Sequence, residues 1–143
     1  KIKGAIGYWN QGNSAAGSDL SGVSGSLSVL LPFGLSLTVG AADQDDDTAG
    51  SFRDDTEWRY AKVGYKFKGL ELGQTRLYAE YSLTEDGAAA NRDAEYFGIG
   101  VVQILEPLGA ELYLDYKNFS LDVQGAADPD DVDQVAAGAR FKF

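Results

Sequence analysis

The sequence contains no cysteine, no histidine and no methionine among its 143 residues, and only 3 prolines. Without cysteine the chain has no disulfide framework, no thiol nucleophile and no thiolate metal site. Without histidine it has no imidazole base and lacks the common ligand of zinc and haem. These absences exclude most hydrolytic triads and most transition-metal sites. We therefore expect neither enzymatic activity nor a cofactor.

Long hydrophobic runs are also missing, since no stretch approaches the roughly 18 apolar residues that a transmembrane helix needs. Positive charge is scarce: 12 Lys and Arg face 22 Asp and Glu, which gives a net charge of −10. A chain with this charge repels nucleic-acid phosphates, so nucleic acid is not an expected partner. The length suits one domain, and we treat residues 1–143 as a single unit.

What the sequence does have is hydrophobic alternation with a period of two, which is typical of β-strands. It predicts eight strands, at about 2–10, 22–31, 35–42, 58–67, 75–84, 96–104, 110–119 and 134–143. Long polar connections (11–21, 43–57, 85–95, 120–133) alternate with short ones (32–34, 68–74, 105–109). Strands of about ten residues can cross a bilayer when tilted. The pattern predicts an all-β fold, an antiparallel transmembrane β-barrel meander with eight strands in this chain.

The two faces of these strands differ in charge. One face is apolar and uncharged throughout, whereas the other carries ten charged residues and two tyrosines. The twelve residues are Lys3, Lys62, Lys66, Arg76, Tyr78, Glu80, Glu111, Tyr113, Asp115, Lys117, Arg140 and Lys142. Ten charges cannot fill a dry core, so the apolar face is expected to look outward into lipid and the charged face to line a pore.

Glycines recur in phase with the charged residues, at positions 7, 40, 64, 98, 100 and 138. Glycine weakens a strand, and its usual role there is to make room for a neighbour. The room at these positions suits the inward side chains of Tyr78 and Tyr113. Ordinary bends of a barrel explain the same glycines equally well.

Aromatic residues separate into two groups along the predicted strands. Tyr8, Tyr81, Phe97 and Tyr116 fall near the long connections, whereas Phe33, Tyr65, Phe67, Phe141 and Phe143 fall near the short ones. Aromatic rings favour the two interfaces of a membrane, so this separation predicts two aromatic girdles. A general preference of aromatic residues for strands explains their number but not their separation.

The charges also divide by region. The long connections hold 17 acids against Arg53 and Arg92, whereas the inward face holds seven bases and three acids. Because the acidic connections and the basic wall oppose each other, we expect only weak ion selectivity. In the alternative interpretation, Lys62, Arg76, Glu80, Glu111 and Arg140 pair with one another and fill a narrow barrel.

One acidic connection raises the question of calcium, because oxygen-rich loops bind hard cations. Asp43, Asp45 and Asp47 match the first three acidic positions of a helix-loop-helix calcium loop, but Thr48 stands where that loop requires glycine. A solvated acidic loop is therefore the favoured interpretation. Loose bridging by divalent cations to lipopolysaccharide phosphates is a further hypothesis.

The C-terminal third carries the most specific pattern. The segments at 96–103, 108–113 and 135–143 read YFGIGVVQ, LGAELY and VAAGARFKF. They resemble the end of a Gram-negative general diffusion porin, of an alphaproteobacterial-like kind. Phe143 with the alternating Phe141 resembles the signal that this family presents to the barrel assembly machinery. The resemblance implies passive diffusion of ions and small hydrophilic solutes through the bacterial outer membrane, contact with lipid and lipopolysaccharide, a homotrimer, and no cofactor.

The chain departs from that family in strand number. Such porins usually have sixteen strands, and the eight predicted here align with the last eight. The sequence is therefore either the C-terminal half of a longer porin or a complete small barrel. The alternative function is that of a closed, side-chain-filled eight-stranded barrel with a structural, adhesive or engineered-scaffold role. A soluble ligand-binding barrel is a third and more distant interpretation.

Overall fold

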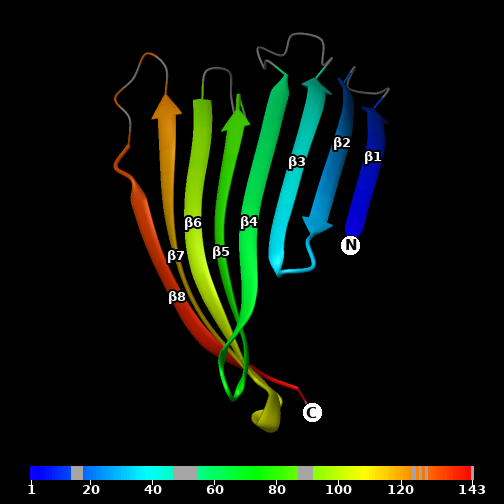
Figure 1. Cartoon of the computed structure of the whole chain (residues 1–143). Helices are drawn as coiled ribbons and strands as arrows, with labels where there is room; N and C mark the ends of the chain where they lie inside the picture. The colour runs from blue at the N-terminus through cyan, green and yellow to red at the C-terminus, as the bar shows by residue number, and fades with distance from the viewer. Residues whose placement is uncertain are drawn as a thin grey trace.

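The computed structural model describes residues 1–13, 18–46, 55–86, 92–123, 125, 127 and 129–142. They form one antiparallel sheet whose eight strands lie side by side in chain order (Figure 1). The strands are β1 (Ile2–Asn13), β2 (Ser18–Leu30), β3 (Leu35–Asp46), β4 (Thr56–Leu70), β5 (Gly73–Glu85), β6 (Arg92–Leu105), β7 (Ala110–Val123) and β8 (Val132–Phe141). A 3₁₀ turn, η1 (Glu106–Leu108), joins β6 to β7. The prediction of an all-β antiparallel meander with eight strands is confirmed.

The strands extend further toward the long connections than the hydrophobic pattern indicated. β3 continues to Asp46 rather than to residue 42, and β6 begins at Arg92 rather than at residue 96. The ladder continues because backbone pairing does not require apolar side chains once the two strands are aligned. The strand ends beside 14–17, 47–55, 86–91 and 124–131 all lie at one end of the sheet, the top of Figure 1, which we call the long-connection end. The opposite end is the short-turn end.

The sheet curves across its width but does not close (Figure 1). Every strand pairs with its sequence neighbour, and no pairing joins β1 to β8 within the described residues. The alternative interpretation, a small barrel closed by these eight strands alone, is therefore not what the described residues form. The part of the chain that the structure describes contains no helix long and apolar enough to span a membrane.

A hydrophobic core is almost absent. Ala110, at 2% exposure, is the sole buried hydrophobic residue among those described. Large apolar side chains on the face predicted to be apolar remain open, including Ile6 at 90% and Leu114 at 50%. A single sheet with nothing stacked on it cannot bury either face. The apolar face therefore needs another apolar environment to cover it.

Glycine is needed in the turn between β2 and β3, where the backbone of the turn packs closely against β4. Gly34 has a φ of +97°, and a Cβ at this position would collide with the carbonyl oxygen of Lys66. In return, the Lys66 N–H donates to the Gly34 carbonyl at 3.0 Å. This short turn aligns β3 with β4, the strand that carries Lys62 and Lys66.

Candidate functional site

All twelve predicted pore-lining residues lie on one face of the sheet. Residues directly opposite each other on paired strands share a face, and successive residues alternate between faces. The register aligns Lys62 with Glu80, Lys66 with Arg76, and Glu111 with Arg140. Each of the other residues is an even number of positions from one of these on the same strand, or lies opposite an inward residue of the neighbouring strand. Gly98, Gly100 and Gly138 are such inward residues. We call this the inward face, and we call the opposite apolar face the outward face.

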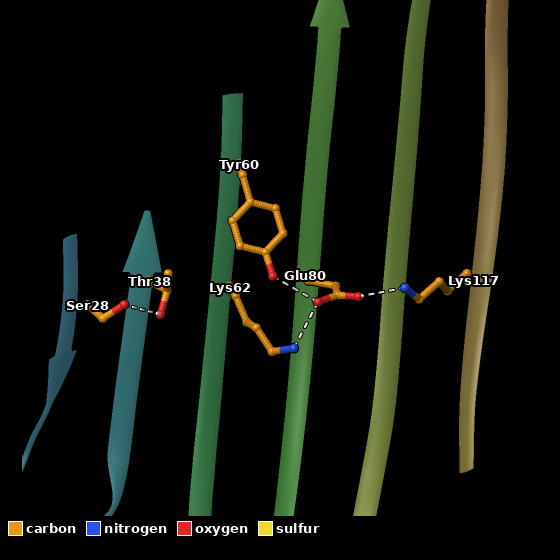
Figure 2. Close-up of polar contacts among 6 residues, drawn as sticks. All are labelled: Ser28, Thr38, Tyr60, Lys62, Glu80 and Lys117. Carbon is orange, nitrogen blue, oxygen red and sulfur yellow. Dashed lines mark hydrogen bonds and ion pairs between the residues drawn. The ribbon is translucent and has the colours of Figure 1, made fainter. Parts of the chain in front are cut away.

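Glu80 is the centre of the inward face (Figure 2). Its side chain is 6% exposed and bridges two lysines from different strands. Lys62 Nζ lies 2.9 Å from Oε2, and Lys117 Nζ lies 3.1 Å from Oε1. Tyr60 donates its hydroxyl proton to Oε2 at 2.9 Å. Two cations and a phenol thus hold one carboxylate, which leaves this cluster with a net positive charge.

The cluster belongs to a polar row that crosses most of the sheet. Ser28 Oγ and Thr38 Oγ1 lie 2.9 Å apart, and the register aligns Thr38 with Lys62 (Figure 2). Further along the row, Gly98 lies between Glu80 and Lys117. A Cβ at Gly98 would lie 3.1 Å from Cγ of Glu80. The missing side chain leaves the gap across which Lys117 reaches the carboxylate.

A second ionic cluster lies toward the short-turn end. Glu111 accepts from Lys142 at 2.7 Å and lies 3.6 Å from Arg140 Nη1. Arg140 and Lys142 are 70% and 64% exposed at their side chains, so solvent screens both pairs. As in the first cluster, two bases share one acid. The other four charged residues of the set, Lys3, Lys66, Arg76 and Asp115, form no ion pair with another described residue.

Aromatic rings on the inward face lie over glycines of the neighbouring strand. Tyr78 is aligned with Gly100 and Tyr113 with Gly138, and in each pair a Cβ on the glycine would overlap the ring. Lys62 Nζ lies 3.8 Å from the centroid of the Tyr78 ring, within the range of a cation–π contact. The room that the sequence indicated for Tyr78 and Tyr113 is present at these two glycines.

Filling one of these gaps should destabilise the sheet. Gly100→Val would displace the Tyr78 ring, and with it the contact to Lys62, at an expected cost of about 1–2 kcal/mol in the free energy of unfolding. Urea unfolding in detergent, followed by tryptophan fluorescence, measures this change. Gly4→Val is the matched control, since the nearest atom to its Cβ would be a carbonyl oxygen at an ordinary 3.5 Å. Equal stability of the two variants would contradict the packing interpretation.

The inward face is hollowed between β5 and β8. One hollow of about 210 Å³ is lined by Tyr78, Val102, Glu111, Tyr113, Asp115 and Arg140. Five of these six residues are among the predicted pore-lining residues. The structure therefore brings together, on one open polar surface, residues that lie up to 62 positions apart in the sequence.

Two features of the site were missed by sequence reasoning. Tyr60, which donates to Glu80, lies two residues before Lys62, so the period of two from Lys62 could have identified it. On the outward face at the long-connection end, Arg59 pairs with Glu57 and lies 3.0 Å from Glu85. Glu57 and Glu85 are aligned across β4 and β5, a register that the sequence alone did not supply.

The calcium candidates are only partly within the described residues. Asp43 and Asp45 lie near the long-connection end of β3, whereas Asp47 is outside the described residues. Among the residues that the structure describes, no group of three or more acidic, histidine or cysteine side chains could hold a metal ion. Of the two residues resembling an assembly signal, Phe141 ends β8 with 59% exposure, and Phe143 is outside the described residues.

No protein-family model, no curated protein and no solved structure matches this chain.

Proposed function

We propose that this chain forms part of the wall of an outer-membrane porin, a water-filled β-barrel for passive diffusion of ions and small hydrophilic solutes. The observation that carries the proposal is the opposition of the two faces. The outward face exposes apolar side chains along every strand and carries Glu57, Arg59 and Glu85 only at its long-connection end, whereas the ten charges predicted from the sequence lie on the inward face. A soluble protein would bury the apolar face, whereas a membrane barrel presents it to lipid.

The positions of the outward aromatic residues support a tilted arrangement of strands in a membrane. Tyr81 and Phe97 are aligned across β5 and β6, and the same register row contains Gly4 on β1 and Asn118 on β7. Tyr8 lies four residues beyond this row toward the long-connection end, and Tyr116 lies two residues short of it. When strands are tilted, a ring of side chains at one level of the membrane falls at a different position in the register on each successive strand. The aromatic girdle predicted near the long connections is thus compatible with the tilt of barrel strands.

Pore formation requires more strands than this sheet contains. Eight strands enclose an interior filled by side chains, whereas about sixteen leave an aqueous channel. We propose that the open edges of the sheet are completed by further strands in the membrane. By the resemblance to general porins, the proposed surroundings are outer-membrane lipid and lipopolysaccharide, insertion is by the barrel assembly machinery, and three barrels form a trimer.

Conductance with site-directed labelling tests this function. Because the chain has no cysteine, a single cysteine can be labelled without background. We expect ohmic steps when the refolded protein is added to a planar bilayer. A cationic thiosulfonate should lower the single-channel current of Asp115→Cys, whose side chain faces inward.

Leu114→Cys is the matched control, because it adjoins Asp115 on β7 and its side chain lies on the lipid-facing side, with 50% exposure. Labelling at residue 114 should leave the current unchanged. Folded, inserted protein that carries no current would overturn the porin function. An equal response at 114 and 115 would overturn the assignment of the inward face as the pore wall.

A further inference from the structure

Large apolar side chains also occur on the inward face, although the interior wall of a water-filled barrel is expected to be polar. Phe119 and Leu121 of β7 are each 37% exposed, and Val132 of β8 is 61% exposed. Phe119 and Leu121 lie two and four residues beyond Lys117, and Val132 lies opposite Phe119. All three therefore share the face of Lys117. A contiguous apolar surface that remains exposed marks a contact for another molecule.

Aromatic rings extend this surface across the sheet toward β4. Tyr60, Tyr96 and Phe119 lie in one register row, on β4, β6 and β7. Trp58 stacks on Tyr60 with ring centroids 5.7 Å apart, and the rings of Tyr96 and Phe119 are 5.6 Å apart. We call the whole set the aromatic patch: Trp58, Tyr60, Tyr96, Phe119, Leu121 and Val132.

A polar row borders the aromatic patch on the side toward the short-turn end. From β4 to β8 it contains Lys62, Glu80, Gly98, Lys117 and Gln134. The polar row lies two residues along each strand from the row of Tyr60, Tyr96 and Phe119, a separation of about 7 Å. A six-membered sugar ring with one substituent has a similar length, so one small solute can contact both rows.

Lys117 links the polar row to the aromatic patch. Its Nζ lies 3.1 Å from Glu80 Oε1 and 5.2 Å from the centroid of the Tyr96 ring. An ammonium group has three N–H donors, and the side chains of Lys117 and Lys62 are both partly exposed. Each lysine can therefore donate to a solute while it holds Glu80 (Figure 2). Because two cations share one carboxylate, the charge of the polar row favours an anion.

We propose that the aromatic patch and the polar row form a weak binding site for acidic sugars. The ring of a hexuronate lies on the patch, and its carboxylate binds Lys117 and Lys62. The broad faces of a pyranose ring carry C–H groups, which pack against aromatic rings. Its hydroxyls bond with Tyr60 and Gln134, polar groups that a simple aromatic acid would leave unused. This inference deepens the proposed function by naming a solute class, and it rests on that function for the water-filled channel.

Two acidic residues near the long-connection end are directed away from this site. Glu57 and Glu85 lie on the outward face, where both interact with Arg59. Arg92, at the start of β6, lies on the inward face, because it is four residues from Tyr96 on the same strand. These strand ends thus place a base, rather than the two acids, on the face that carries the site.

Equilibrium binding tests the inference without relying on conductance. The full 143-residue chain is refolded in detergent and titrated with sodium glucuronate, and binding is followed by saturation-transfer NMR. We expect millimolar affinity, with saturation transferred to the ring protons of the sugar. Glucose has a similar ring without the charge and should bind about fivefold more weakly. Acetate, which has the charge without the ring, and benzoate, which lacks the hydroxyls, should also bind more weakly than glucuronate.

Variants of Phe119 test the contribution of the patch. Phe119→Ala removes one ring and should weaken glucuronate binding about fivefold or more. Phe119→Leu keeps an apolar side chain and should also weaken binding, so the test does not depend on the smaller variant folding. Phe97→Ala is the matched control, since Phe97 is an exposed aromatic residue on the outward face, opposite Asn118. It should leave glucuronate binding unchanged. Retained β-sheet circular dichroism shows that each variant folds.

Variants of Lys117 test the contribution of the charge. Lys117→Gln should lower glucuronate affinity about threefold to fivefold and leave glucose affinity unchanged, so the preference for the acidic sugar should shrink. Lys117→Arg keeps the charge and should retain that preference. An equal loss of affinity for both sugars in Lys117→Gln would mean that Lys117 only supports the fold, and it would overturn the proposed carboxylate contact.

The outcomes for the site and for the porin function can be told apart. Absence of glucuronate binding, or binding of acetate or benzoate as tight as that of glucuronate, would overturn the acidic-sugar site. Unchanged affinity in both Phe119 variants would overturn the role of the patch. If the protein conducts despite such a result, the porin function stands without the site. Glucuronate binding by folded, inserted protein that carries no current would support the site and overturn the porin function.

Discussion

Val101→Arg is expected to lower the free energy of unfolding in a lipid bilayer by about 2–4 kcal/mol, the cost of a cation on the lipid face of a barrel near the midplane. Val101 lies on the outward face of β6, between Leu77 of β5 and Leu114 of β7. Neither neighbour can pair with a guanidinium. In the proposed membrane setting, the arginine would have to reach an interface or draw water and headgroups to its own depth.

Val102→Arg is the matched control, since it introduces the same side chain at the next residue of the same strand. Val102 lies on the inward face, between Arg76 and Tyr113, and it lines the same hollow as Glu111 and Asp115. In the proposed channel, water would solvate the new charge, and repulsion from Arg76 would cost less than about 1 kcal/mol. We therefore expect Val102→Arg to be the more stable variant by a clear margin.

The comparison is made by urea titration of both variants in lipid vesicles, with unfolding followed by tryptophan fluorescence. Val101→Arg should unfold at lower urea concentration, and it should also insert less efficiently. The opposite order, with Val102→Arg the less stable, would mean that the charged face is the dry one. That result would overturn the assignment of outward and inward faces on which the porin function depends.

Glu80→Gln should have the second largest effect, because it removes the one carboxylate that Lys62, Lys117 and Tyr60 share. Hydrogen bonds to charged groups contribute about 1.5–3 kcal/mol each. The lysines are 35% and 29% exposed, so water compensates part of the loss. We expect a total decrease of about 2 kcal/mol in the free energy of unfolding, measured by urea titration in detergent.

The same substitution should change ion preference. The predicted pore-lining residues include seven bases and three acids, and Glu80→Gln leaves seven bases and two acids among them. The wall charge sets ion preference in a water-filled channel, so the reversal potential in a salt gradient should move toward anion selectivity. Glu71→Gln changes the net charge equally but lies in the exposed turn between β4 and β5. It should alter neither stability nor reversal potential, and an equal shift in both variants would contradict the pore position of Glu80.

The number and order of the strands could be predicted because each strand carries its own signal. Alternation places Leu77, Ala79 and Tyr81 on one face of β5 without reference to any other strand. The bounds at the long-connection end could not be predicted, since polar residues such as Asp45 join the ladder only after their partners are aligned. Whether the sheet closes into a barrel could not be predicted from local patterns either. It depends on the summed curvature of the sheet, and the structure leaves β1 and β8 apart.

For the candidate site, too, the sequence could predict the face of each residue but not its contacts. Alternation alone assigned Lys62, Glu80 and Lys117 to one face. It could not say that they meet, because Glu80 and Lys117 are 37 positions apart in the chain and make contact only through the register of three strands, β5, β6 and β7. Gly98 illustrates the difference: its phase was visible in the sequence, and its place between Glu80 and Lys117 was not.

What the sequence by itself determined is a sheet with one charged face and one apolar face, since side-chain alternation is a local property of an extended chain. Only the tertiary structure decided which charges are neutralised, because ion pairing requires atoms within about 4 Å across strands. The tertiary structure also decided that the sheet stays open. Closure depends on the curvature summed over the whole sheet, and no pairing joins β1 to β8 within the described residues.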